Sequence, residues 1–330
     1  MKTISTILLS LTILLVLPLS VMAQTISLSL SPPLIETMVK PGKSLLVAYT
    51  LENNADPAIM HAYVRSFEPK GNTGAIKIKD ELEGPVHFSL DNSDIELDKP
   101  FFMKPNGSQQ LLLRIRIPEG APEGDYYYTL LASSEPPSMA ISSSASGARA
   151  TIGANILITV TQSGYTKVNA KIALFDVLSH FSLPFIGKIH LFDSSDKVPV
   201  SLVLQNNGAN FLKPEGSIEM RGNFGEKAMY DLLPQNVLAE SQRLLTATPS
   251  ADLDCGTSKN SLCKAPASLI LSGFFIGKYN LSTTINFGDG TPNIYASTSF
   301  FALPLKFLFG LIVAIGIGVL VVLKLKNREE

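Results

Sequence analysis

The stretch QLLLRIRIP, residues 110–118, decides the fold of this chain. Its odd-numbered positions from Leu111 to Ile117 are all apolar, whereas Arg114 and Arg116 occupy the positions between them. An alternation of period two places one face of a β-strand against a core and the other face in water, as in antiparallel sheets. The stretch therefore predicts a half-buried strand.

The same alternation recurs through the chain, and turn sequences rich in Gly, Pro and Asn separate the alternating stretches. Many short strands with few helix-like stretches indicate β-sandwiches. We therefore predict an all-β protein of two tandem immunoglobulin-like β-sandwiches, followed by a single C-terminal transmembrane α-helix. The alternating stretches that carry this prediction are Leu45–Leu51, Ile152–Val160 and Val198–Leu204.

An internal repeat supports the tandem arrangement. LENNADPA begins at Leu51 and LQNNGANF at Leu204, while GDYYYTLLA begins at Gly124 and GKYNLSTTI at Gly277. Both pairs are separated by 153 positions. Two matches at one spacing indicate two units of similar topology.

Domain boundaries follow from this repeat. We predict the first sandwich over 24–162 and the second over 163–300, with the joint close to 162–165. The Ser- and Ala-rich stretch 133–150 lies between two predicted strands of the first unit, so it is interpreted as a long loop.

Each unit carries a tyrosine two residues after a glycine that opens a strand, Tyr126 in the first and Tyr279 in the second. A tyrosine at a strand corner can bury its ring and return its hydroxyl to the backbone. We predict both residues to be structural tyrosine corners.

The N-terminal segment has the features of a secretory signal peptide. Lys2 precedes the apolar run 7–17, and small or modest residues end at Ala23. This order predicts a signal peptide over 1–23, with cleavage after Ala23 and export of the remaining chain.

The C-terminal segment contains an apolar run. No charged residue occurs within 307–323, and three basic residues follow within 324–330. About 20 apolar residues are needed to cross a bilayer, and basic residues favour the cytoplasmic side. We predict a transmembrane helix over 301–323 and a cytoplasmic tail over 324–330, which makes the chain a single-pass type I cell-membrane protein with an extracytoplasmic ectodomain.

The same segment has two further features. A sortase signal would require Thr-Gly after the Leu-Pro pair, whereas LPLKF stands at 303–307. Gly310, Ala314 and Gly318 recur every four residues and form a possible helix-dimer face, because small residues allow close helix approach.

The only two cysteines, Cys255 and Cys263, lie close together in one short segment. In an exported protein, two such residues usually pair, so we predict a disulfide bond. A metal site would need further ligands, and no histidine lies nearby.

No catalytic motif is present, and we expect a non-enzymatic protein without cofactor or metal. The segment 91–100 gathers four acids, Asp91, Asp94, Glu96 and Asp98. Four acids could supply oxygen ligands to calcium, but a strand with its acids in water is favoured. His61 is interpreted as a surface residue of a strand. Because 27 basic residues oppose 28 acidic ones, a nucleic-acid partner is not expected.

Two segments of the first unit carry a resemblance to a known family; they are SLSPPLIETMVKPGKSLLVAYTLENNADPAIMHAYVRSFEPKGNTG (29–74) and KPNGSQQLLLRIRIPEGAPEGDYYYTLLAS (104–133). Both resemble the first domain of the bacterial WxL-interacting cell-surface proteins. The second domain of these proteins is resembled by two later segments, LVLQNNGANFLKPEGSIEM (202–220) and NVLAESQRLLTATPS (236–250). The resemblance implies a peptidoglycan-associated first domain, a second domain that contacts surface proteins carrying WxL domains, and one membrane helix.

Together these observations predict a membrane-anchored cell-surface protein that binds cell-wall peptidoglycan, other surface proteins, or both, as an adhesion or scaffold protein. The alternative is a chaperone-like or structural accessory of a surface or pilus assembly system that holds partner strands. The sequence leaves the oligomeric state open.

Overall fold

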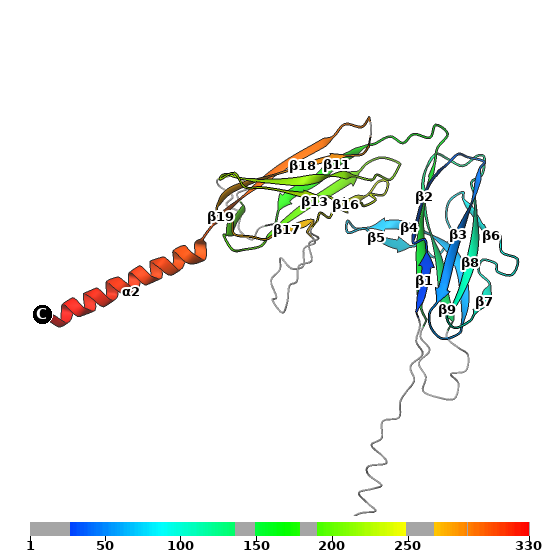
Figure 1. The fold of residues 1–330 in the computed structure, drawn as a ribbon. Helices are drawn as coiled ribbons and strands as arrows, with labels where there is room; N and C mark the ends of the chain where they lie inside the picture. The colour runs from blue at the N-terminus through cyan, green and yellow to red at the C-terminus, as the bar shows by residue number, and fades with distance from the viewer. Residues whose placement is uncertain (1–26, 136–148, 179–189, 249–266, 289, 330) are drawn as a thin grey trace, which may run out of the picture.

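The computed structural model describes residues 27–135, 149–178, 190–248, 267–288 and 290–329. They form two β-sandwiches and a C-terminal helix, α2 (Figure 1). The predicted all-β architecture of two immunoglobulin-like sandwiches is confirmed at this level. The signal peptide over 1–23 and the predicted disulfide between Cys255 and Cys263 lie outside the described residues.

Two sheets make the first sandwich, here called domain 1. One sheet has the strand order β1 (Leu28–Ser31), β3 (Ser44–Asn53), β8 (Gly107–Arg116), β6 (His87–Leu90). The other has the order β2 (Leu34–Val39), β10 (Thr151–Val160), β9 (Gly124–Glu135), β4 (Ala58–Lys70), β5 (Ala75–Ile78), and β7 (Pro100–Met103) also pairs with β4.

Domain 2 follows the same plan. Its smaller sheet contains β11 (Ala170–Val177), β13 (Val198–Asn206), β16 (Gln242–Leu244) and β17 (Leu269–Leu271). The larger sheet has the order β12 (His190–Asp193), β19 (Ile294–Leu303), β18 (Gly277–Asn286), β14 (Glu215–Gly222), β15 (Lys227–Asp231).

Both domains close in the same way. In each, an early strand pairs in parallel with the last strand, β2 with β10 in domain 1 and β12 with β19 in domain 2. The repeat at a spacing of 153 residues therefore marks equivalent strands. Gly124 opens β9 and Gly277 opens β18, and each of these strands pairs antiparallel with its domain's last strand.

The repeated asparagines Asn53 and Asn206 are both buried at the ends of equivalent strands. Asn206 donates through Nδ2 to the carbonyls of Asn210, Val237 and Leu238 at 2.8, 3.1 and 3.0 Å. Its Oδ1 accepts from the Gly208 amide at 2.9 Å. Buried carbonyls need such partners, so these side chains fix the turns that follow both strands.

The alternation predicted for the strands is observed in the cores. In β8, Leu111, Leu113 and Ile115 are fully buried, and Arg114 and Arg116 lie on the other face. In β10 the alternation of buried and exposed residues is interrupted, because Leu157 and Thr159 are buried and so are the residues on either side of them. These two side chains belong to the outer face of the sheet, which domain 2 covers.

Two interpretations of local segments are wrong. Most of 91–100 is a loop rather than a strand, because Ile95 turns into the core and interrupts regular pairing. Asp91 forms an ion pair with Arg114. Residues 133–135, assigned to the loop 133–150, belong to β9, which continues to Glu135.

The C-terminal prediction needs correction. The described part of the chain contains no helix with both the length and the apolarity of a membrane span, so the predicted transmembrane helix over 301–323 is not supported. Its predicted start is also wrong, because β19 runs to Leu303 and buries Phe300 and Ala302 in the core. Helix α2 comprises Leu305–Glu329.

The start of α2 is attached to domain 2 by a small polar network. The Lys306 amide donates to Asp193 Oδ2 at 2.9 Å, and Lys306 Nζ donates to Asp196 Oδ1 at 2.7 Å. Ser195 Oγ donates to Asp193 Oδ1 at 2.7 Å. The hydrogen bond from the Lys306 amide, followed by that from Ser195, lowers the pKa of Asp193. Asp193 thus satisfies an amide at the helix N-terminus.

Replacing Asn206 with alanine removes the donor of the Asn210 carbonyl and the acceptor of the buried Gly208 amide, whereas the carbonyls of Val237 and Leu238 keep hydrogen bonds from the Leu212 amide and the Ser241 hydroxyl. We expect Asn206→Ala to reduce the free energy of unfolding by about 2–4 kcal/mol, since each unsatisfied buried group costs roughly 1–3 kcal/mol. Asn207→Ala, at an exposed neighbour, is the matched control and should stay within about 0.5 kcal/mol. Denaturant unfolding measures both, and equal effects would contradict the role of Asn206.

The Asp193 contacts should contribute stability at neutral pH and lose it in acid. Because the folded-state pKa lies below the unfolded value, the contribution is present above about pH 4 and disappears as pH falls through the folded pKa. Unfolding of wild type and Asp193→Asn, measured from pH 7 downward, should differ most at neutral pH and converge in acid. A difference that grows in acid would refute this assignment.

Candidate functional site: the joint between the two sandwiches

The carboxylate of Asp125 joins the two domains. From domain 1 it accepts Tyr127 Oη–H at 3.0 Å and Thr159 Oγ1–H at 2.7 Å. From domain 2 it accepts Asn210 Nδ2–H at 2.9 Å and the Phe211 amide at 2.5 Å. Hydrogen bonds to a carboxylate are stronger than neutral ones. One side chain therefore fixes the loop after β13 against the first sandwich.

The register of the larger sheet explains why these groups meet. Thr159 of β10 lies directly opposite Asp125 of β9. Two residues further along each strand, Leu157 lies opposite Tyr127 on one side and opposite Glu36 of β2 on the other. Because side chains alternate between faces, all five residues share the outer face that meets domain 2.

Tyr127 provides a second link. Its ring stacks on Phe67 with centroids 5.7 Å apart. Its hydroxyl accepts the amide of Ala239 in domain 2 at 2.8 Å while donating to Asp125. Burial, followed by the nearby Asp125 charge, raises the pKa of Tyr127, so the hydroxyl remains protonated and able to donate.

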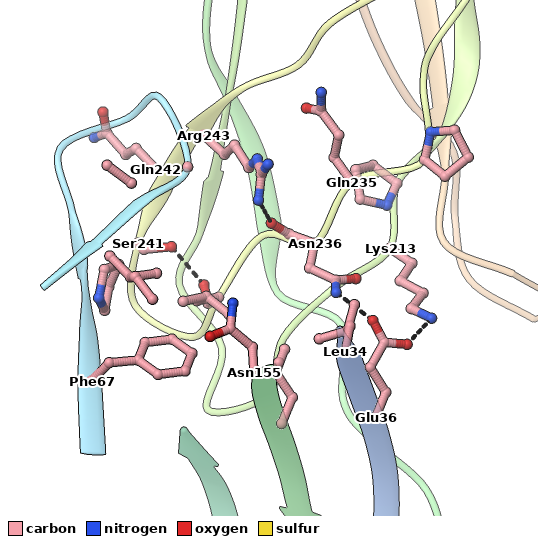
Figure 2. A pocket seen from close by; sticks show the side chains of 18 of the residues that line it. Leu34, Glu36, Phe67, Asn155, Lys213, Gln235, Asn236, Ser241, Gln242 and Arg243 are labelled. Carbon is pink, nitrogen blue, oxygen red and sulfur yellow. Dashed lines mark hydrogen bonds and ion pairs between the residues drawn. The ribbon is translucent and has the colours of Figure 1, made fainter. Parts of the chain in front are cut away.

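Glu36 provides a third link. It is paired with Lys213 and accepts a hydrogen bond from the Asn236 side chain, and both partners belong to domain 2 (Figure 2). The side chain of Glu36 is 19% exposed and that of Lys213 is 58% exposed. The pair thus lies at the rim of the joint, with its acidic member turned inward.

The hairpin formed by β4 and β5 completes the joint. It projects from domain 1 toward β16 of domain 2 (Figure 1), where the Leu244 amide donates to the Asn72 carbonyl at 2.7 Å. At Gly74 an added Cβ would lie 2.7 Å from the guanidinium carbon of Arg243. Gly74 also has a φ of +83°, a backbone conformation that favours glycine at this turn.

These links border a partly open pocket of about 490 Å³ between the domains (Figure 2). Its apolar lining includes Leu34, Phe67, Leu157 and Leu238, and Arg243 is among its polar groups. This volume falls in the range of small-molecule sites. Among the described residues, no group of three or more His, Cys, Asp or Glu side chains could hold a metal ion.

A second feature lies at the edge of the same sheet. β2 pairs only with Asn155–Val160 of β10, and the Asn155 amide donates to Pro33 at 2.9 Å. Backbone groups of alternate residues point to the same side of a strand. The N–H and C=O groups of Thr151 and Gly153 therefore face this side too, where no described strand pairs with them.

The sequence-predicted tyrosines lie apart from this joint's contacts. Tyr126 donates its hydroxyl to the Pro122 carbonyl at 2.9 Å, four residues upstream. Tyr279 is buried, stacks on Phe300 with centroids 5.1 Å apart, and donates to Glu226 Oε1 at 3.0 Å. Of the repeated motif GDYYY, it is Asp125 and Tyr127, on either side of Tyr126, that reach domain 2.

Gly310, Ala314 and Gly318 lie on α2, and all three are exposed. An added Cβ at Gly310 or Gly318 would meet no atom within 4 Å. A helix-dimer face at these positions therefore stays a prediction. His61 lies in β4, and its Nε2 is 2.8 Å from Glu135 Oε1 of β9.

No protein-family model matches the sequence, and comparison with curated protein sequences finds no match. Among solved structures, the class 5 fimbriae chaperone CfaA is similar at 11% identity and a TM-score of 0.39, over 82% of this chain and 99% of that chain. The Acinetobacter baumannii CsuC–CsuE chaperone–tip adhesion subunit complex is similar at 10% identity and a TM-score of 0.35, over 84% of this chain and 99% of that chain. The E. coli chaperone DraB is similar at 13% identity and a TM-score of 0.34, over 82% of this chain and 98% of that chain.

These values describe a distant likeness of two β-sandwich domains. They define neither a family nor a function for this chain. What the site can do follows from its own geometry, which combines a fixed joint, a partly open pocket and an unpaired strand edge.

Removing the Asp125 carboxylate should loosen the joint while leaving both sandwiches folded. In Asp125→Ala, the Phe211 amide should exchange with deuterium at least tenfold faster because it loses its hydrogen bond to the carboxylate, and the Ala239 amide should follow because Tyr127, its acceptor, loses the contact with Asp125. Asp231→Ala, at an exposed position of domain 2, is the control. Unchanged exchange in Asp125→Ala would show that the joint does not depend on this residue.

Proposed function

We propose that this chain is a non-enzymatic binding protein that holds an extended segment of a partner protein by strand addition at the free edge of β10. The proposal adopts the holding role that the sequence left as its alternative, within the broader class of surface scaffold proteins. One observation carries it, the unpaired side of β10 at residues 151–154.

The geometry at this edge supports the proposal. Thr151 and Gly153 direct their backbone groups away from β9, on the side where β2 pairs further along the strand. On this side β2 is preceded by Pro32, Pro33 and β1, which pairs with β3 in the other sheet, so a partner strand would extend the sheet where the chain crosses between the two sheets. Strand addition of this kind derives affinity from main-chain hydrogen bonds and specificity from alternate side chains.

The composition of the edge supports the same role. Proteins commonly protect free edges with charges, prolines or short strands. This edge contains neither a charged residue nor a proline at positions 151–154. Thr151 and Gly153 are exposed. The edge is therefore competent to pair, and the Asp125 joint would hold the bound segment at a constant orientation to domain 2.

Other parts of the sequence-based prediction stay predictions. Binding of peptidoglycan or of WxL-domain proteins rests on the family resemblance alone. The cell-surface location depends on a signal peptide over 1–23, which lies outside the described residues. Neither is required for strand addition.

The edge is tested by replacing Thr151 with proline. Proline removes the outward N–H and is tolerated at the first residue of a strand, so the thermal midpoint should change little. A photo-crosslinking amino acid at Arg149, next to the edge, should capture a partner peptide in the producing cells. Thr151→Pro should lower the yield of this adduct at least tenfold, and Thr151→Ala should not.

The control places the crosslinker at Ser282, an exposed residue whose strand is paired on both sides. An equal yield with Thr151→Pro, or no adduct at position 149, would refute the proposal. Adducts containing only peptidoglycan fragments would also refute it and would favour the wall-binding interpretation.

A further inference from the structure

We propose that the pocket between the two sandwiches binds a carboxylate attached to an apolar group, with Arg243 pairing with the carboxylate. This site is separate from the free edge of β10 and does not depend on partner binding there. The inference rests on an arginine whose charge is not compensated, on the fixed position of that arginine, and on the apolar walls around it.

Arg243 is the uncompensated group. Its Nη1 donates to the Asn236 carbonyl at 2.7 Å, and no carboxylate of the described residues forms an ion pair with it. Its Nε is buried without a hydrogen-bond partner. Burial also lowers the pKa of Arg243, which shows that water solvates the charge less well than on an open surface. An anion beside a partly desolvated guanidinium gains strong, directional hydrogen bonds.

The arginine is held in place by domain 1. The backbone at Gly74 lies against the guanidinium, and the neighbouring Leu244 amide is bonded to Asn72. Because the group is already ordered, a ligand would not have to immobilise a flexible side chain on binding. In Figure 2, Arg243 points toward the centre of the pocket.

The other charged groups of the pocket do not neutralise Arg243. Glu36 is engaged by Lys213 and Asn236 at the opposite wall. Glu215 also lines the pocket, but its side chain is exposed to water. The uncompensated charge in the interior is therefore positive, which favours an anionic ligand.

The remaining walls select the body of the ligand. Leu34, Phe67, Leu157 and Leu238 surround a volume of about 490 Å³. Apolar walls with a small number of placed polar groups are typical of small-molecule sites. The same chemistry is offered by a free acid and by the C-terminal carboxylate of a peptide that ends in an apolar residue.

The test uses the full-length chain and two pairs of probes. The first pair is phenylacetate and phenylacetamide, and the second is N-acetyl-Gly-Phe with a free or an amidated C-terminus. Isothermal titration should show that at least one acid binds at least tenfold more tightly than its own amide. The acid that binds more tightly identifies the source, a free acid or a chain end.

The variant Arg243→Gln should weaken binding of the preferred acid at least tenfold, and Arg243→Lys should retain part of it. Arg221→Gln removes an equal charge from an exposed site on β14, paired with Glu219, and should bind as wild type. Thermal unfolding checks that each variant is folded. Absence of acid binding, equal binding of acid and amide, or unchanged binding by folded Arg243→Gln would overturn the proposal.

Discussion

The carboxylate of Asp125 makes the largest set of hydrogen bonds among the links described between the two sandwiches. Asp125 stands at the start of β9 and accepts two hydrogen bonds from its own domain and two from the next. A carboxylate offers about four acceptor positions, so this set uses its capacity fully. The pocket exists because this contact and the Glu36 pair hold the outer face of one sheet against the loops of domain 2.

The strands and the tandem plan could be predicted from sequence because their signals are local. Alternation at 111–117 and the spacing of 153 residues are visible within short windows. The joint could not be predicted in this way, because Glu36, Asp125 and Arg243 come from segments far apart in the chain. The one local trace in the sequence is Leu157, an apolar residue at a position where the alternation of β10 would place a polar one, whereas Thr159 is ordinary for a face in water.

The two domains use equivalent positions for different purposes. Gly124 and Gly277 begin equivalent strands, yet the tyrosine that follows is partly exposed in domain 1 and buried in domain 2. In domain 2 the ring of Tyr279 packs with Phe275 and Phe300 inside the sandwich. In domain 1 the flanking Asp125 and Tyr127 face outward to the neighbour. A shared backbone plan thus carries an internal cluster in one copy and an external joint in the other.

The parallel pairing of β12 with β19 has a mechanical consequence. A pull on α2 enters domain 2 along β19, which is paired with β18 over nine residue pairs and with β12 over four. Tension along the axis of a paired strand loads its hydrogen bonds in shear, so that many must break together instead of one after another. The Asp193–Lys306 contact lies where the load enters. Domain 2 is therefore suited to transmit force between its C-terminal helix and domain 1.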